Sequence, residues 1–120
     1  MPARNDGLRE RLSRNREINI TVTGRKSGRR ISLPVWFVLE GDKLYFLPVA
    51  GSDTQWYKNV LENAGIGIEA GGAKAGFHVV PIADAKQVSS VVAKFQAKYG
   101  ACDVKKYYSK FDVAVVVQVD

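Results

Sequence analysis

The sequence has few residues that could bind a metal or form a disulfide. It contains a single cysteine, Cys102, and a single histidine, His78. One cysteine excludes an intrachain disulfide, and the two residues together leave too few soft ligands for a zinc site of the usual type. We therefore expect no metal. His78 lies in an expected strand with no assignable acid or nucleophile beside it, so we leave it out of the candidate site.

Long hydrophobic runs are also missing. No apolar stretch approaches the roughly 20 residues that a membrane-spanning helix needs, and residues 1–20 lack the hydrophobic centre of a secretion signal. We therefore expect no transmembrane segment and a cytoplasmic protein. With 120 residues, 46% of them hydrophobic, the chain is long enough for one packed domain. We expect an N-terminal basic segment at 1–17 and a folded domain at 18–120.

Acidic residues are scarce where the positive charge is concentrated. The net charge is +6, and residues 1–30 contain all eight arginines and Lys26 but only three acids. The rest of the chain has equal numbers of lysines and acids. An excess of charge confined to one part of the chain favours a local site for an anion over a surface coated for nucleic acid.

Hydrophobic patterns predict the first three strands. Residues 18–23 (INITVT) alternate with period two, whereas 31–39 (ISLPVWFVL) are apolar on both faces from Pro34 onward, as are 44–49 (LYFLPV). Between the latter two, EGDK at 40–43 predicts a tight hairpin with Gly41 in the turn. Strands that are apolar on both faces need cover on both sides. In an antiparallel sheet, a barrel interior covers one side, and a helix, a partner subunit or a flat ligand covers the other.

Capping signals predict two helices. Ser52 and Gln55 have the spacing of a capping box, so we expect a helix from about 53 to 64. A second helix is expected between Asp84, as its N-cap, and Gly100, as its stop, because valines and aromatic residues follow helical spacing there.

The remaining segments complete a predicted barrel. Residues 66–70 and 74–82 predict a hairpin around Gly71 and Gly72, and 112–119 predicts a last strand with alternating valines. A short polar stretch with Tyr107 and Tyr108 precedes it and could be a third helix. We therefore expect a mainly β (α+β) fold: a six-stranded antiparallel barrel with two or three flanking helices.

The turn between the first two strands carries the densest positive charge. Its glycines flank five residues with suitable groups: Arg25, Lys26, Ser27, Arg29 and Arg30. Backbone N–H groups in a concave turn, a hydroxyl and several cations together suit a phosphate. The turn is not a Walker loop, because arginine stands before Lys26 where that motif has glycine, and a strand follows instead of a helix. The alternative is a solvated hairpin tip.

Three stretches resemble the deazaflavin-dependent nitroreductase family of split β-barrel flavin-type reductases. They are TGRKSGRRISLPVWFV, EGDKLYFLPVAG and WYKNV, in order and approximate spacing, and the resemblance covers roughly residues 18–82. It implies a split β-barrel cofactor-binding domain whose cofactor is the deazaflavin coenzyme F-420. Where many relatives have a basic residue late in the turn, this chain has Ile31.

The resemblance also implies roles for individual residues. The phosphate of the cofactor would be held by Arg25, Lys26, Ser27 and Gly28, with Arg29 or Arg30 supplying the charge that Ile31 lacks. The flat ring would be bordered by Pro34 and by Val49, Ala50 and Gly51, and closed from the helix by Trp56 and Asn59. Tyr99 would be the candidate proton donor. For Trp56, for Tyr107 and for Tyr108, packing in the core or on the surface is the competing interpretation.

The expected function is the reduction of a small molecule by a bound cofactor. No nucleophile motif or paired carboxylates are evident, so the cofactor must supply the chemistry. We expect hydride transfer from reduced deazaflavin to an electron-poor small molecule: a nitro compound, a quinone or an activated alkene. FMN is the alternative cofactor, a homo-oligomer is compatible with the sequence, and a family member could bind the cofactor without catalysing reduction. An alternative of another class is a nucleic-acid-binding β-barrel that stacks bases on Trp36, Tyr45 and Trp56.

Overall fold

The protein is described here by a computed structural model covering residues 17–70 and 73–118. The predicted basic segment up to residue 16, the predicted turn at Gly71 and Gly72, and Val119 lie outside the described residues.

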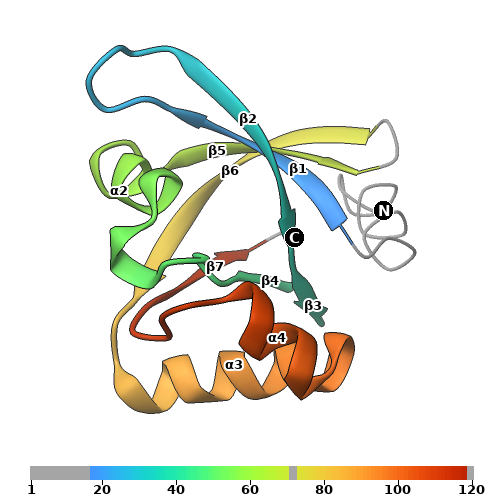
Figure 1. Cartoon of the computed structure of the whole chain (residues 1–120). Helices are drawn as coiled ribbons and strands as arrows, with labels where there is room; N and C mark the ends of the chain where they lie inside the picture. The colour runs from blue at the N-terminus through green and yellow to red at the C-terminus, as the bar shows by residue number, and fades with distance from the viewer. Residues whose placement is uncertain (1–16, 71–72, 119–120) are drawn as a thin grey trace.

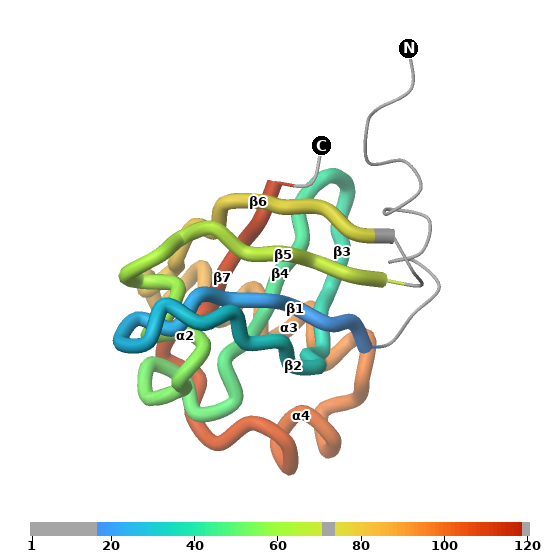
Figure 2. The backbone as a smooth tube through the Cα atoms, turned by 90° about the horizontal axis from the view of Figure 1, so that it is seen from above, coloured from blue at the N-terminus to red at the C-terminus, as the bar shows by residue number. Residues whose placement is uncertain are grey.

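In the part of the chain that the structure describes, seven antiparallel strands form one sheet in the order β2-β1-β5-β6-β7-β4-β3. Figures 1 and 2 show the sheet curling round, with β1, β2, β5 and β6 on one side and β3, β4 and β7 on the other. The strands are β1 (Glu17–Thr23), β2 (Arg30–Trp36), β3 (Val38–Glu40), β4 (Lys43–Phe46), β5 (Gly65–Ala70), β6 (Ala73–Ile82) and β7 (Ala114–Gln118). The predicted mainly β, antiparallel class is confirmed.

The predicted number of strands is wrong by one, because the run 31–39 is broken at Phe37. The residues before Phe37 pair with β1 as strand β2, and those after it pair with β4 as strand β3. These two strands are the opposite edges of the sheet, so the chain passes from one edge to the other through a single residue. The sheet therefore closes into a split barrel at Phe37.

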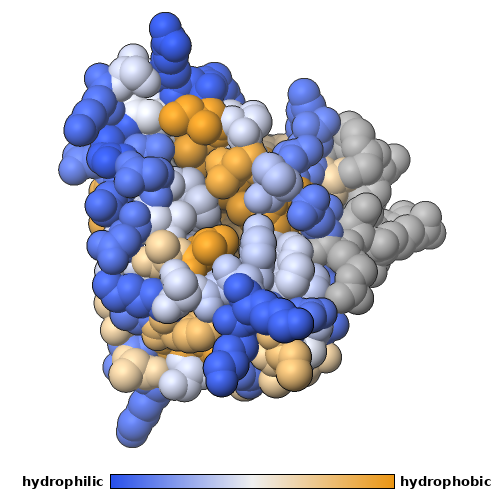
Figure 3. Space-filling view, viewed as in Figure 1, coloured by the Kyte–Doolittle hydropathy of each residue, from blue (hydrophilic) through white to orange (hydrophobic). Residues whose placement is uncertain are grey.

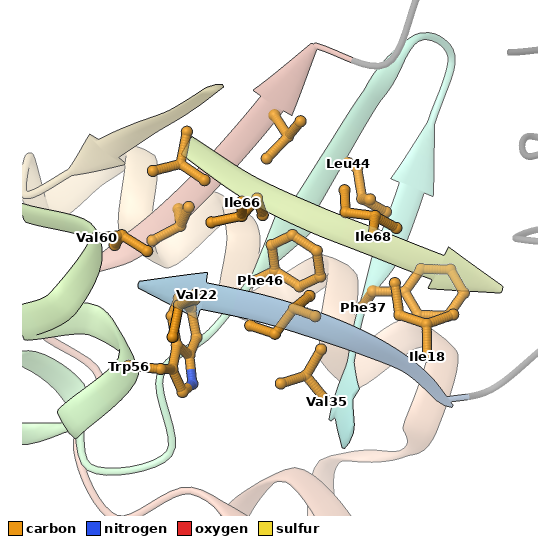
Figure 4. Close-up of a cluster of buried hydrophobic side chains, with 14 of the residues drawn as sticks. Ile18, Val22, Val35, Phe37, Leu44, Phe46, Trp56, Val60, Ile66 and Ile68 are labelled. Atoms are coloured by element: carbon orange, nitrogen blue, oxygen red, sulfur yellow. The ribbon is translucent and has the colours of Figure 1, made fainter. Parts of the chain in front are cut away.

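The alternating pattern of β1 places its hydrophobic residues inside the barrel. Ile18, Ile20 and Val22 are buried, while the residues between them are exposed or half-buried. Figure 4 shows Ile18 and Val22 facing residues from the other strands of the core, with Trp56 entering from the helix side next to Val22. Phe46 lies in this core, and its ring meets that of Trp56 edge to face, with centroids 6.3 Å apart.

A second, smaller core lies between the sheet and two helices, α3 (Ala85–Tyr99) and α4 (Ala101–Tyr107), which Figure 1 shows together below the barrel. The predicted caps of α3 are confirmed: the Asp84 side chain accepts a hydrogen bond from the Gln87 backbone N–H, and Gly100 ends the helix with φ +95°. Helix α3 therefore begins and ends where the sequence predicts.

The first predicted helix is shorter than expected. A short 3₁₀ helix, η1 (Gly51–Asp53), precedes helix α2 (Gln55–Glu62), and Thr54 is the N-cap without a side-chain capping bond. The predicted capping box at Ser52 is therefore wrong. Ser52 instead donates its backbone N–H and its hydroxyl to Asp112, far away in the sequence.

Candidate functional site

An apolar cleft lies along the free edge of β2. Its volume is about 240 Å³, and its walls come from β2 (Leu33 to Trp36), the segment after β4 (Leu47, Val49, Thr54), helix α2 (Trp56) and the end of α4 (Tyr107, Tyr108). Among the described strands, β2 pairs only with β1, so its other edge is open to this cleft. Pro34 has no N–H to donate, which suits an unpaired edge.

The cationic turn stands at one end of the same strand. In Figure 3 the side of the molecule near the β1–β2 turn is hydrophilic, and hydrophobic surface lies in the middle of the face. The strand pairing and the core contacts show which end of the cleft is near the turn. Trp56 packs beside Val22, which pairs with the start of β2, whereas Trp36 pairs with Glu17 at the opposite end of β1. Trp56 therefore lies at the end of the cleft nearest the turn, and Trp36 lies at the far end.

The turn is closed by its own hydrogen bonds. The Gly24 N–H donates to the Arg29 carbonyl (2.7 Å), and the Gly28 N–H donates to the Gly24 carbonyl (2.9 Å). The Arg29 N–H donates to the Ser27 hydroxyl (3.2 Å), and Gly28 adopts φ +71°. Within the described chain, the adjacent N–H groups of Lys26 and Ser27 have no acceptor. Two neighbouring donors at an exposed tip form the start of an anion-binding nest.

Arg25 is held against helix α2. Its backbone N–H and its Nη1 both donate to Asn59 Oδ1 (3.2 and 2.7 Å), and its Nη2 donates to Gln55 Oε1 (3.0 Å). Both acceptors are neutral amides, so no carboxylate among the described residues neutralises Arg25. The structure thus brings Arg25 and Asn59 together, and the buried Asn59 contacts the turn instead of lining the cleft.

The structure separates Arg30 from the rest of the turn. Its guanidinium extends over the outer face of the sheet and lies 3.9 Å from the position of a Cβ on Gly67. There it lines an open trough of about 450 Å³ with Thr21, Ser32 and Lys74. This geometry does not support the predicted contact of Arg30 with the phosphate held by the tip.

The segment bordering the cleft opposite β2 is clamped by a distant loop. The Val49 carbonyl accepts the Ser109 N–H (2.8 Å), and Ala50 forms a parallel bridge with Lys110. Gly51 is buried with φ +56°, and a Cβ on it would overlap Asp112 Oδ1. Val49 lines the cleft, whereas Ala50 and Gly51 shape its border from behind.

Charged groups complete this clamp. Lys110 lies 3.2 Å from Asp53 and 3.6 Å from Asp112. The hydrogen bond to Asp53 is the main reason that the Lys110 pKa is raised, and the Ser52 hydroxyl is the main reason that the Asp112 pKa is lowered. Both shifts favour the charged forms, so the clamp is a set of paired ions at neutral pH.

Aromatic side chains close the far end of the cleft. Trp36 stacks with Tyr99 (centroids 4.3 Å apart, 11° between planes) and with Tyr107 (4.5 Å, 29°). Tyr108 meets Trp36 edge to face at 6.1 Å. Burial is the main reason that the Tyr108 pKa is raised, and the neighbouring tyrosines add to the shift.

The structure does not bring Tyr99 into the cleft. Tyr99 is buried, and its hydroxyl accepts the Phe37 N–H (3.1 Å) and donates to the Phe37 carbonyl (2.9 Å). The hydroxyl therefore serves the backbone at the closing point of the barrel. This arrangement does not favour its predicted role as a proton donor.

Other expectations can be compared with the described residues. Within 17–70 and 73–118, His, Cys, Asp and Glu form no group of three that could hold a metal ion. In the same ranges, no helix combines the length and hydrophobicity that crossing a membrane requires. Trp56 is 4% exposed, and Trp36 is stacked with Tyr99 and Tyr107, so neither indole is open for base stacking while Tyr107 is in place.

Sequence reasoning missed the wall that α4 contributes. Tyr107 and Tyr108 line the cleft with Leu33 and Leu47, although none of these was among the predicted site residues. Adjacent tyrosines in a short polar helix were the available signal. Their position over β2 depends on packing between segments more than 60 residues apart, which no local pattern contains.

The chain can be compared with known proteins. A family model described as "Uncharacterized protein conserved in bacteria (DUF2255)" matches residues 9–118. Among the curated proteins, none matches this chain.

Several solved structures share the fold. An F-420-H2 dependent reductase is 18% identical, with a TM-score of 0.66 over 86% of this chain and 94% of that chain. A candidate 5-nitroimidazole antibiotic resistance protein from Bacteroides thetaiotaomicron is 14% identical, with a TM-score of 0.73 over 100% and 81%. The heme storage protein of Vibrio cholerae is 12% identical, with a TM-score of 0.68 over 95% and 88%. At these identities the likeness shows a common split-barrel fold, found in reductases and in heme-binding proteins.

Proposed function

Because the chain belongs to the DUF2255 family and has the fold of split-barrel reductases, we propose that it is a reductase that uses coenzyme F-420. FMN is the alternative cofactor. The observation that carries this proposal is the alignment of a cationic turn and an apolar, aromatic cleft along one edge strand. A cofactor with an anionic tail and a flat ring needs these two surfaces in that order.

The turn would bind the phosphate. The exposed Lys26 side chain supplies charge, and the free N–H groups of Lys26 and Ser27 supply directed donors. Arg25 uses two of its five side-chain N–H donors on Asn59 and Gln55, which leaves its full charge and its other donors for the anion. Fixing the turn to α2 lowers the entropy that phosphate binding would otherwise cost.

The cleft would hold the ring. Pro34 and Val49 form apolar walls on opposite sides, and Trp56 closes the end nearest the turn. The apolar and aromatic character of these residues suits a flat ring. The volume of about 240 Å³ is slightly less than the usual range of about 300–1,000 Å³ for small-molecule sites. A bound ring would therefore need one wall to yield.

When bound, the reduced cofactor supplies a hydride, that is two electrons and one proton, to an electron-poor acceptor. The protein's own part is orientation and exclusion of water, which the apolar walls provide. The acceptor would be a nitro compound, a quinone or an activated alkene that enters at the aromatic end of the cleft, next to Trp36.

Cofactor retention tests this proposal. The full chain is incubated separately with coenzyme F-420 and with FMN, and the cofactor retained after removal of free ligand is identified. Its affinity is then measured in a separate fluorescence titration. We expect one cofactor to be retained and Lys26→Ala to weaken its binding about tenfold, the equivalent of about 1.4 kcal/mol.

Lys43→Ala is the matched control, because Lys43 is also exposed but begins β4 after the β3–β4 turn. It should bind like the unmodified chain. If neither cofactor is retained, the proposed function is refuted. If Lys26→Ala binds as tightly as Lys43→Ala, the phosphate does not lie at the turn.

A further inference from the structure

Three tyrosines surround Trp36, and they are held very differently. Tyr99 is buried and fixed by two hydrogen bonds to Phe37. Tyr108 is 3% exposed and packs against Phe95. Tyr107 is 39% exposed, and among the described residues no hydrogen bond holds its hydroxyl. Of these three tyrosines, Tyr107 is therefore the one that can move at least cost, because in the described chain only its edge-to-face contact with Tyr108 (centroids 5.0 Å apart) and its stack on Trp36 hold it.

Tyr107 also covers the indole face of Trp36 that lines the cleft. It belongs to the last turn of α4, a helix of seven residues, and its ring stacks with Trp36 at 4.5 Å. A flat ligand entering at this end would seek the same indole surface. Stacked aromatic pairs gain only a modest stabilisation beyond the area they bury, so a ligand ring can compete with Tyr107.

We propose that Tyr107 is an exchangeable ring, which covers Trp36 until the flat ring of the acceptor replaces it. This proposal rests on the proposed function for the identity of the acceptor, but not for the exchange itself. Outward movement of Tyr107 would also enlarge the cleft, which is slightly small with Tyr107 in place.

The chemistry of the stack favours one class of acceptor. Trp36 and Tyr99 are electron-rich rings whose faces carry partial negative charge. An electron-poor aromatic ring stacks face to face on such a surface better than another electron-rich ring does. Tyr107 would therefore yield to a nitroaromatic ring more readily than to an unsubstituted one, which makes it a residue that determines specificity.

Nuclear magnetic resonance can observe the exchange directly. The chain has two tryptophans, so its spectrum has two indole N–H signals, and Trp36→Phe identifies which signal belongs to Trp36. The full chain, without added cofactor, is titrated with 1,3-dinitrobenzene, with benzene as the comparison. We expect the Trp36 signal to shift with dinitrobenzene at lower concentrations than with benzene.

The variants of Tyr107 give the decisive comparison. Removing the competing ring in Tyr107→Ala should tighten dinitrobenzene binding roughly 2- to 10-fold, whereas Tyr107→Phe, which keeps the ring, should bind like the unmodified chain. Tyr107→Leu also removes the ring and should behave like Tyr107→Ala. Agreement between the two variants shows that the change in affinity comes from loss of the ring and not from an effect of alanine on α4.

The outcomes separate this proposal from the previous one. If both ring-deleting variants bind dinitrobenzene equally or more weakly, Tyr107 is an ordinary contact wall and the exchange is refuted. The same holds if dinitrobenzene never shifts the Trp36 signal. If the exchange is seen although no cofactor is retained, Tyr107 has the proposed property and the reductase assignment fails alone.

Discussion

At the scale of single residues, Tyr99 satisfies backbone groups that the sheet leaves unpaired. Phe37 separates two strands, so its N–H and carbonyl are not part of either ladder. The Tyr99 hydroxyl bonds to both groups, and Lys98 Nζ also donates to the carbonyl (2.9 Å). Removing the hydroxyl therefore takes the acceptor away from the buried Phe37 N–H, while the Phe37 carbonyl keeps the hydrogen bond from Lys98.

We expect Tyr99→Phe to lower the free energy of unfolding by about 1–3 kcal/mol, the cost of an unsatisfied buried group. Urea denaturation followed by circular dichroism measures this change. Tyr107→Phe removes the same hydroxyl from an exposed ring and should stay within about 0.5 kcal/mol of the unmodified chain. Equal effects of the two substitutions would contradict a special role for the Tyr99 hydroxyl.

Single residues also show what the sequence could predict. Gly41, Asp84 and Gly100 act through their immediate neighbours, and each has its predicted place in a turn or cap. Ser52 has the correct spacing for a capping box but bonds to Asp112, sixty residues away. A local pattern cannot reveal a competing partner that only the fold brings near.

At the scale of elements, the loop 109–112 clamps the segment 49–53 and so fixes one wall of the cleft. The Ser52 hydroxyl, the Ser52 backbone N–H and Lys110 all face the Asp112 carboxylate, and Asp53 faces Lys110. The lowered pKa of Asp112 means that folding favours its ionised form. Its contribution to stability is therefore present above the ordinary pKa of about 3.9 and is lost as the pH falls through the lower folded value.

We expect the unmodified chain to lose more thermal stability between pH 6 and pH 2.5 than Asp112→Asn does, because asparagine cannot be protonated in this range. Thermal melts at the two pH values measure the difference. Asp103→Asn, an equal change at an exposed position in α4, is the control and should lose as much as the unmodified chain. An Asp112→Asn variant that is as acid-sensitive as the unmodified chain would show that the clamp is not ionic.

Elements were more predictable than their contacts. Period-two alternation identified β1 and helical spacing identified α3, because these patterns reflect burial against any core. The attachment of Arg25 to α2 was not predictable, since the cluster of cations pointed only to solvent or to an anion. Its acceptors, Asn59 and Gln55, lie on a different element whose packing the sequence does not state.

At the scale of the whole molecule, Phe37 joins the two edges of the barrel. Its side chain is fully buried, and Lys98 Nζ lies 3.6 Å from the centre of its ring. We expect Phe37→Ala to cost about 3–5 kcal/mol, a large part of the 5–15 kcal/mol typical of a folded domain.

Denaturation midpoints test this expectation against Val80→Ala, which truncates a residue that is 60% exposed on β6. The control should change stability by less than about 0.5 kcal/mol. A loss below about 1 kcal/mol for Phe37→Ala would mean that the barrel does not depend on this joint. The sequence could not reveal the joint, because residues 34–39 (PVWFVL) are apolar throughout and contain no signal for a break at Phe37.

The place of β7 in the sheet also constrains how the chain can assemble. Strand β7 follows every other strand in sequence, yet it lies between β6 and β4 and pairs with both. Before residues 114–118 leave the ribosome, β2, β1, β5 and β6 can form one ladder and β3 and β4 another, with no strand to bridge them. Pairing of residues 114–118 with both ladders is therefore the step that unites the two halves of the sheet, and closure of the barrel has to wait for it.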